Sequence, residues 1–124
     1  MRKLLSILFL VLCLGCLASC GDDDTKPTKI VVGMECAYAP FNWTETTKTD
    51  SNYPISNLGN GAYAEGYDVQ VAKIIAKELG LELEIKALAW DALIQNLNTG
   101  GIDMIIAGMS PTPERLETID FTDA

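Results

Sequence analysis

The feature that most restricts the fold of this chain is an alternation between strand-type and helix-type hydrophobic patterns along residues 29–106. Strand-type stretches are short and rich in β-branched or alternating apolar residues, whereas helix-type stretches repeat apolar residues every three or four positions. Short joints between such stretches predict a parallel β-α-β-α-β unit with right-handed connections, a fold of the α/β class. The strand-type stretches are residues 29–34, 81–87 and 102–106, and the helix-type stretches are residues 66–80 and 91–100.

The first helix-type stretch predicts which side chains its helix buries. One apolar stripe is expected to face the sheet, with polar side chains opposite and Gly80 as the C-terminal stop. Asp68 is expected to be the cap or a first-turn acid of this helix, and Asp91 is expected to cap the second helix. The expected buried stripe comprises Tyr67, Val71, Ile74, Ile75 and Leu79.

Residues 42–65 interrupt this order with a long polar stretch. Thr, Asn, Ser, Gly and Pro dominate it, and it is too long for an ordinary connection between a strand and a helix. We expect a long surface excursion without regular structure, apart from a hairpin turn near Asn60 and Gly61. The pattern leaves the role of this excursion open.

An anion-binding site is predicted where the third strand-type stretch ends. The residues there read as a loop of small side chains followed by a helix that Thr112 caps and Pro113 begins. A carboxylate could bind here in three ways. Small side chains let it approach the backbone, the helix start has unpaired N–H groups, and the guanidinium of Arg115 can donate to it. The alternative is a capped surface helix whose arginine pairs with Glu114 or Glu117.

The expected position of this site in the sheet favours ligand binding. In parallel sheets of this kind, ligands bind outside the carboxyl ends of the strands, where the strand order reverses. The segments that leave those ends are residues 35–41, Trp90 with its neighbours, and residues 108–115. These segments contain aromatic side chains, loop residues with small side chains, and an arginine. We therefore expect them to bind a small anionic or zwitterionic molecule.

The N-terminal residues read as a lipoprotein leader. A basic start, an apolar run of signal-peptide length and small residues before Cys20 have the form of a bacterial lipobox. We expect a signal peptide over residues 1–19, a lipid on the Cys20 thiol and a polar tether over residues 20–28. An ordinary signal peptide cleaved near Ala18 is the alternative, and Cys16 is a poorer lipobox match. Each of these interpretations predicts that the chain is exported from the cytoplasm.

Charge and residue types narrow the classes of function. Loss of Arg2 and Lys3 with a leader reduces nine basic residues to seven, against 17 acidic residues, for a net charge of −10. Such a charge disfavours nucleic acid and anionic membrane surfaces as partners. The chain has no histidine, which removes Ser-His and Cys-His nucleophile pairs and the usual zinc ligand sets. We therefore expect no catalytic residue, metal or cofactor. The other cysteines belong to the expected leader or would carry the lipid, so no disulfide is expected for Cys36.

Five short motifs occur in a fixed order along the chain. They are residues 35–41 (ECAYAPF), residues 66–69 (GYDV), residues 90–94 (WDALI), residues 107–110 (AGMS) followed by Glu114 and Arg115, and residues 120–122 (DFT). In this order they resemble the family 3 extracellular solute-binding proteins, the polar amino-acid receptors of ABC importers. The likeness extends from Ile30 to Ala124, and the series of motifs is far more specific than any one of them.

The resemblance implies a periplasmic-binding-protein-like type II clamshell, with residues 29–124 as part of the first lobe only and the second lobe absent. It implies a monomeric, lipid-anchored receptor on the extracytoplasmic side of the cell membrane, which binds a polar amino acid and delivers it to an ABC permease. Two alternatives stay open on the same fold, a dehydratase-like enzyme and the ligand-sensing domain of a signalling protein. One departure is residues 42–65, which are longer than the family's common link.

The resemblance also implies which residues bind the carboxylate end of the ligand. Arg115 matches the arginine that forks onto the α-carboxylate, with Ser110 and the backbone at Gly108 as further donors. Met109 lies within the same motif and is included in the predicted site.

A second group is implied for the side chain of the ligand. Tyr38 and Trp90 match positions that flank it, and Phe41 belongs to the same motif as Tyr38. Glu35 occupies an acidic position that in several relatives faces a ligand amine or amide, which favours a polar or cationic side chain.

Overall fold

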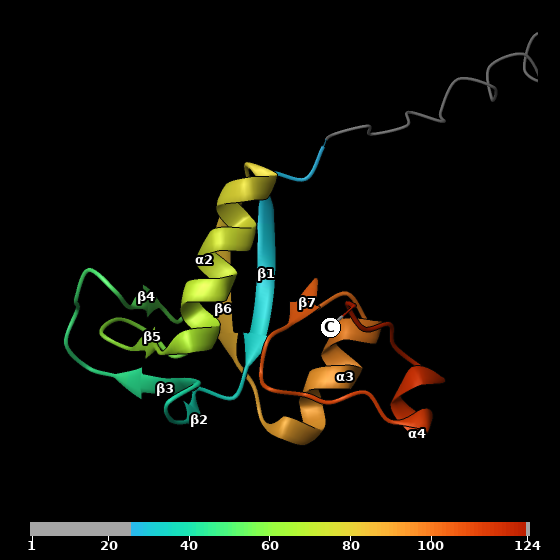
Figure 1. Ribbon diagram of the computed structural model, residues 1–124. Helices are drawn as coiled ribbons and strands as arrows, with labels where there is room; N and C mark the ends of the chain where they lie inside the picture. The colour runs from blue at the N-terminus through green and yellow to red at the C-terminus, as the bar shows by residue number, and fades with distance from the viewer. Residues whose placement is uncertain (1–25, 124) are drawn as a thin grey trace, which may run out of the picture.

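The computed structural model describes residues 26–123 and is shown in Figure 1. The expected leader over residues 1–19, Cys20 and the first part of the tether lie outside the described residues. Within residues 26–123, no helix is both long and apolar enough to cross a bilayer.

A three-stranded parallel sheet forms the centre of the fold, in the order β6-β1-β7. It consists of β1 (Lys29–Met34), β6 (Glu82–Ala87) and β7 (Met104–Ile105). The apolar run of β1 lies in the middle, and every residue of this strand after Lys29 is buried. The alternating strand β6 lies at one side, with Leu83 and Ile85 buried and glutamates between them. The predicted parallel β-α-β-α-β unit is thus confirmed, although its third strand is shorter than expected.

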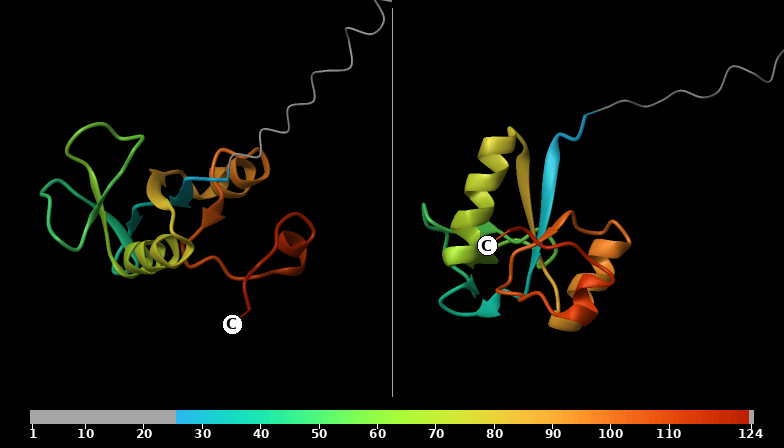
Figure 2. Two further views of the ribbon diagram at one scale, coloured as in Figure 1. Left: turned by 90° about the horizontal axis from the view of Figure 1, so that it is seen from above. Right: turned by 45° about the vertical axis from the view of Figure 1, so that its right-hand side comes forward.

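Two helices pack on this sheet from opposite sides of β1 (Figure 2, right). They are α2 (Tyr67–Leu79), between β1 and β6 in the chain, and α3 (Trp90–Asn98), between β6 and β7. Gly80 ends α2 in the left-handed conformation, with φ of 67°, as predicted. Asp91, in contrast, does not cap α3, because the helix begins one residue earlier at Trp90 and no side chain bonds to its first N–H groups.

The buried face of α2 differs from the predicted stripe. Tyr67, Ile74 and Leu79 are 67%, 61% and 58% exposed, and the side that packs on the sheet carries small residues instead. Alanines allow the helix axis to approach the strands closely, whereas the pattern of large apolar residues selects a face that lies beside the contact. The buried residues are Asp68, Val69, Ala72 and Ala76.

Residues 42–65 are not the irregular excursion that was expected. They supply most of a second, antiparallel sheet of order β2-β3-β5-β4, which projects to one side of the parallel sheet in Figure 2, left. Its strands of two to four residues are too short to show a hydrophobic period. The predicted hairpin turn is confirmed, since it joins β4 to β5. The strands are β2 (Ala37–Tyr38), β3 (Asn42–Glu45), β4 (Tyr53–Pro54) and β5 (Tyr63–Glu65).

The excursion also covers the outer edge of β6. The backbone N–H of Ser56 donates to the carbonyl of Ile85 at 2.8 Å. The side-chain amide of Asn57 bonds both backbone groups of Ala87, at 2.7 and 2.9 Å, as a neighbouring strand would. Exposed strand edges invite pairing with other chains, so this cover gives the long excursion a structural role.

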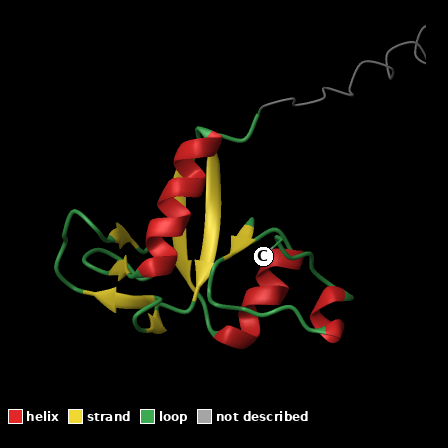
Figure 3. Ribbon diagram, viewed as in Figure 1, coloured by secondary structure: helices red, strands yellow, loops and turns green. Residues whose placement is uncertain are grey.

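Buried side chains from the parallel sheet and its two helices form most of the core. Figure 3 shows how these helices and strands are arranged. Gly33 in β1 permits a close contact within this core, because a β-carbon there would lie 2.5 Å from Cδ1 of Ile102. The largest fully buried apolar side chains of the core are Met34, Ile85, Leu93, Ile102, Val32 and Val69.

Candidate ligand-binding site

The loop that leaves β1 carries an aromatic pair. Tyr38 and Phe41 stack with ring centroids 5.0 Å apart and an interplanar angle of 24°. Both rings stay partly in solvent, at 48% and 39% exposure, although they are large and apolar. Such a pair presents a flat surface on which part of a ligand can pack.

The loop that leaves β7 approaches this pair at Gly108. A β-carbon at Gly108 would lie 3.5 Å from Cε1 of Tyr38, and φ at Gly108 is 63°. A glycine is therefore suited to this position both by its backbone conformation and by the nearby ring. Two of the segments predicted to meet at the carboxyl ends of the strands do so.

Arg115 belongs to α4 (Pro113–Leu116), the short helix after that loop. Its Nη1 donates to the carbonyl of Ser110 at 2.8 Å, and its guanidinium lies over the ring of Trp90, 5.4 Å from the centroid. A guanidinium has five N–H donors, so this arrangement orients the group and leaves further donors for an anion. Arg115 forms none of the ion pairs found in residues 26–123, so the alternative pairing with Glu114 or Glu117 is not observed.

The start of α4 has the predicted cap. The hydroxyl of Thr112 accepts the N–H of Arg115 at 3.3 Å, and Pro113 is the first helical residue. The helix is only four residues long, however, and a single turn sums few peptide dipoles. Anion binding at the expected site therefore depends on the side chain of Arg115 and the loop backbone more than on a helix dipole.

Trp90 has two roles in this geometry. It begins α3, and its half-buried side chain packs against the core while one ring face receives Arg115. Core packing of Trp90 is therefore observed, and its predicted role beside the ligand stays a prediction.

Glu35 is the first residue after β1 and is half-buried. Within residues 26–123, no hydrogen bond or ion pair engages its carboxylate, which leaves it available to a cationic group.

Behind the aromatic pair lies a buried polar network that the sequence did not reveal. Asn42 is fully buried, and its Oδ1 accepts the backbone N–H of Cys36 at 2.8 Å. Its Nδ2 donates to the carboxylate of Asp68 at 2.7 Å, in the first turn of α2. Of the two positions expected for Asp68, the structure shows the first turn, because Gly66 is the N-cap residue. The sequence around Asn42 gives no signal of this role, because its partner on α2 is 26 positions away in the chain.

The network holds an unusual backbone turn at Cys36. This residue has φ of 56°, the left-handed region that costs a residue with a side chain about 1–2 kcal/mol. The Thr44 hydroxyl donates to the Cys36 carbonyl at 2.9 Å, so both of its backbone groups are bonded to side chains. Burial raises the pKa of the Cys36 thiol to about 12, so the side chain is neutral and packs as a small apolar group.

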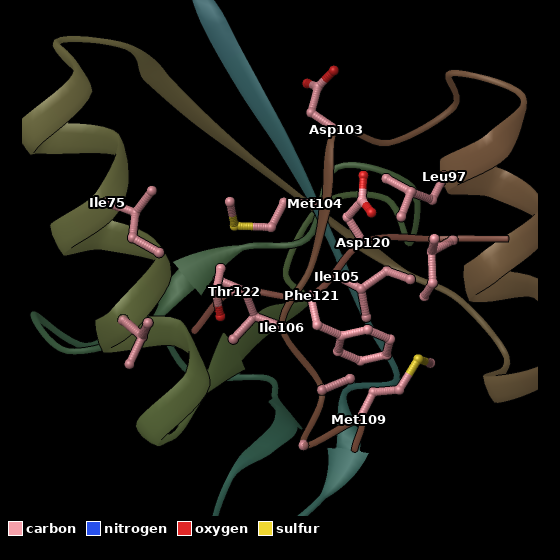
Figure 4. Close-up of a pocket in the computed structure, with 14 residues that line it drawn as sticks. Ile75, Leu97, Asp103, Met104, Ile105, Ile106, Met109, Asp120, Phe121 and Thr122 are labelled. Carbon is pink, nitrogen blue, oxygen red and sulfur yellow. The ribbon is translucent and has the colours of Figure 1, made fainter. Parts of the chain in front are cut away.

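A separate apolar groove of about 390 Å³ lies between α2, α3 and the segment after α4 (Figure 4). Gly108 and Met109 line it, whereas Arg115, Trp90 and Tyr38 do not. The side chain of Met109 thus lies on the groove, and its predicted role in ligand binding stays a prediction. Among residues 26–123, no three potential metal ligands are clustered. Other side chains on the groove are Ile75, Leu97, Met104, Ile106 and Phe121.

Comparison with known proteins places these features in a family. The model of bacterial extracellular solute-binding proteins, family 3, matches residues 30–124. The arginine-binding extracellular protein ArtP of Bacillus subtilis is 30% identical over 99% of this chain and 44% of its own length. The probable ABC transporter arginine-binding protein ArtJ of Chlamydia trachomatis is 34% identical over 95% of this chain and 42% of its own length.

Solved structures show the same fold. The arginine-bound form of domain 1 from TmArgBP, the arginine-binding protein of T. maritima, superposes with a TM-score of 0.61 at 35% identity. The match covers 77% of this chain and 65% of that domain. An ancestral arginine-binding protein bound to arginine gives a TM-score of 0.63 at 35% identity, over 77% of this chain and 36% of that one.

The expected fold class is thereby confirmed as an α/β lobe of the solute-binding type. The chain spans less than half the length of these curated relatives. All four relatives named above are described as binding proteins, in agreement with the expectation that the chain is not an enzyme. Since the family model matches nearly all of the described residues, the chain belongs to the bacterial extracellular solute-binding proteins, family 3.

Proposed function

We propose that this chain supplies the first lobe of the amino-acid receptor of an ABC importer, and that its ligand is a cationic amino acid of the arginine type. One observation carries the proposal: the guanidinium of Arg115 is held by the Ser110 carbonyl and the face of Trp90, with donors left for a carboxylate. Relatives named for arginine binding support the choice of ligand.

The proposed binding mode assigns each end of the ligand to one group of residues. Arg115 binds the α-carboxylate through paired N–H donors. Trp90 and the stacked rings of Tyr38 and Phe41 flank the aliphatic part of the side chain. Glu35, whose carboxylate is not engaged within residues 26–123, pairs with the cationic end. The net charge of −10 after loss of the leader favours the approach of cations.

Titration calorimetry with arginine and citrulline tests this ligand class. Citrulline has nearly the same shape as arginine but carries a neutral urea group in place of the guanidinium. Loss of a hydrogen bond to a charged group is worth about 1.5–3 kcal/mol, so we expect arginine to bind at least tenfold more tightly than citrulline. Arginine bound to domain 1 of TmArgBP supports the use of a single lobe.

Glu35→Gln is the matched control for this measurement, because it keeps the shape of the side chain and removes its charge. It should bring the two affinities close together. Equal affinities for arginine and citrulline in the unaltered chain, or tighter binding of glutamate, would contradict a cationic ligand.

We further infer that Cys20 carries a lipid that holds the receptor on the extracytoplasmic side of the membrane, as a monomer on a tether over residues 20–28. Cys20→Ser should move the protein from the membrane fraction to the soluble fraction of cells, because it removes the thiol that would carry the acyl chains. Cys16→Ser is the control and should stay with membranes. Membrane retention of the Cys20→Ser protein after leader cleavage would exclude this anchor.

A further inference from the structure

The fully buried polar side chains next to the candidate site have no part in the binding mode described above. Asn42 is 0% exposed and Asp68 is 4% exposed, and such groups are costly to bury unless they are hydrogen-bonded. Each is bonded here, and the bonds join three separate segments: the loop after β1, the start of β3 and the start of α2.

These bonds act on one point of the backbone. The Cys36 N–H donates to Asn42 and the Cys36 carbonyl accepts from Thr44, so β3 side chains hold the left-handed turn from both sides. Glu35 precedes this turn and Tyr38 follows it by two residues. The direction of the turn therefore sets how the acid and the first aromatic ring lie relative to each other.

The start of α2 is fastened to the same loop. The N–H of Tyr67 donates to the Pro40 carbonyl at 3.3 Å, and that of Asp68 donates to the Phe41 carbonyl at 2.8 Å. These N–H groups have no partner within the helix, and no side chain caps them. Asp68 thus bonds the loop through its backbone and reaches Asn42 through its carboxylate.

We propose that Asn42 and Asp68 are positioning residues of the ligand-binding site, which fix Glu35, Tyr38 and Phe41 opposite Arg115 and Trp90. The proposal rests on the proposed function for its ligand. A site held only loosely by its supporting residues loses affinity and selectivity, because the groups that contact the ligand no longer meet it in one geometry. Removal of the network should therefore reduce discrimination at the side-chain end of the ligand.

Asn42→Ala in the full chain tests this, with the ratio of citrulline to arginine dissociation constants as the readout. A loss of stability alone lowers the folded fraction equally for both ligands and leaves the ratio unchanged. We expect the ratio to fall about tenfold, comparable to the loss of one hydrogen bond to a charged group. Asp68→Ala should give the same result, while Asp68→Asn, which keeps an oxygen to accept from Asn42, should keep the ratio of the unaltered chain.

Asn52→Ala is the matched control. Asn52 is also a buried asparagine with two hydrogen bonds, to the backbone of Thr49 and Thr47, but both partners lie within the excursion. Its loss should lower stability and leave the affinity ratio unchanged.

Amide hydrogen exchange provides a second readout that needs no ligand. In Asn42→Ala, exchange over residues 35–41 should rise at least tenfold more than exchange in β6, whereas Asn52→Ala should leave residues 35–41 unchanged. A chain that binds no arginine yet shows this localised exchange would contradict the proposed ligand and retain the positioning role. A folded Asn42→Ala protein with an unchanged ratio and no localised rise in exchange would overturn the inference. If Asn42→Ala does not fold, the comparison of Asp68→Ala with Asp68→Asn decides in the same way.

Discussion

Arg115→Ala is expected to weaken arginine binding by about 2–5 kcal/mol, the range for removal of one partner of a buried, hydrogen-bonded charge pair. The guanidinium is oriented before the ligand arrives, by the Ser110 carbonyl at 2.8 Å and by the Trp90 ring at 5.4 Å. A ligand carboxylate then meets fixed donors, and little ordering of the side chain opposes binding. Calorimetry on the full chain measures the change directly.

Two further variants separate charge from geometry at this position. Arg115→Lys keeps the charge but loses the planar fork and its stacking on Trp90, so most of the affinity should still be lost. Lys77→Ala removes the same charge from the exposed last turn of α2 and should change affinity little. Equal losses in Lys77→Ala and Arg115→Ala would mean that overall charge, and not a carboxylate contact, explains the effect.

Gly66→Ala is expected to destabilise the fold by about 3 kcal/mol or more, since it combines backbone strain with overpacking. Gly66 has φ of 124°, and a β-carbon there would lie 2.4 Å from the Phe41 carbonyl oxygen. That oxygen belongs to backbone that bonds the first turn of α2, so it cannot move away without loss of the hydrogen bond to Asp68. Chemical denaturation followed by circular dichroism measures the free energy of unfolding.

Gly61→Ala isolates the contribution of the backbone. Gly61 also has a positive φ, 91°, but a β-carbon there would meet nothing within 4 Å. We expect a loss of about 1 kcal/mol, the cost of a left-handed conformation alone. Similar losses in the two variants would show that the close contact with Phe41 does not matter for stability.

The arrangement of the parallel sheet could be predicted because its strands are long enough, or apolar enough, to show a pattern. The helix face was wrong for a physical reason: α2 packs through Ala72 and Ala76, which contribute little to a pattern of large apolar residues. The antiparallel sheet was missed because its strands are two to four residues long and depend on pairing with distant segments.

The candidate site was predictable in part. The expected parallel direction of the strands predicted that the loops after β1 and β7 meet, and Tyr38 and Gly108 do meet. Asn42 could not be found in this way, because its importance lies in a hydrogen bond to a helix that starts 25 positions later. The ligand roles of all the predicted site residues, Arg115 and Trp90 included, stay predictions that the proposed variants and titrations address.

The two sides of the parallel sheet differ in a way that bears on self-association. The excursion closes the β6 side through Ser56 and Asn57, whereas among residues 26–123 the strand β7 pairs only with β1. A sheet can extend from molecule to molecule only if each molecule has two unpaired strand edges. With the β6 edge already covered, addition of strands from other molecules to the parallel sheet is confined to its β7 edge, so the polar excursion reduces the open edge of this sheet as well as completing the fold.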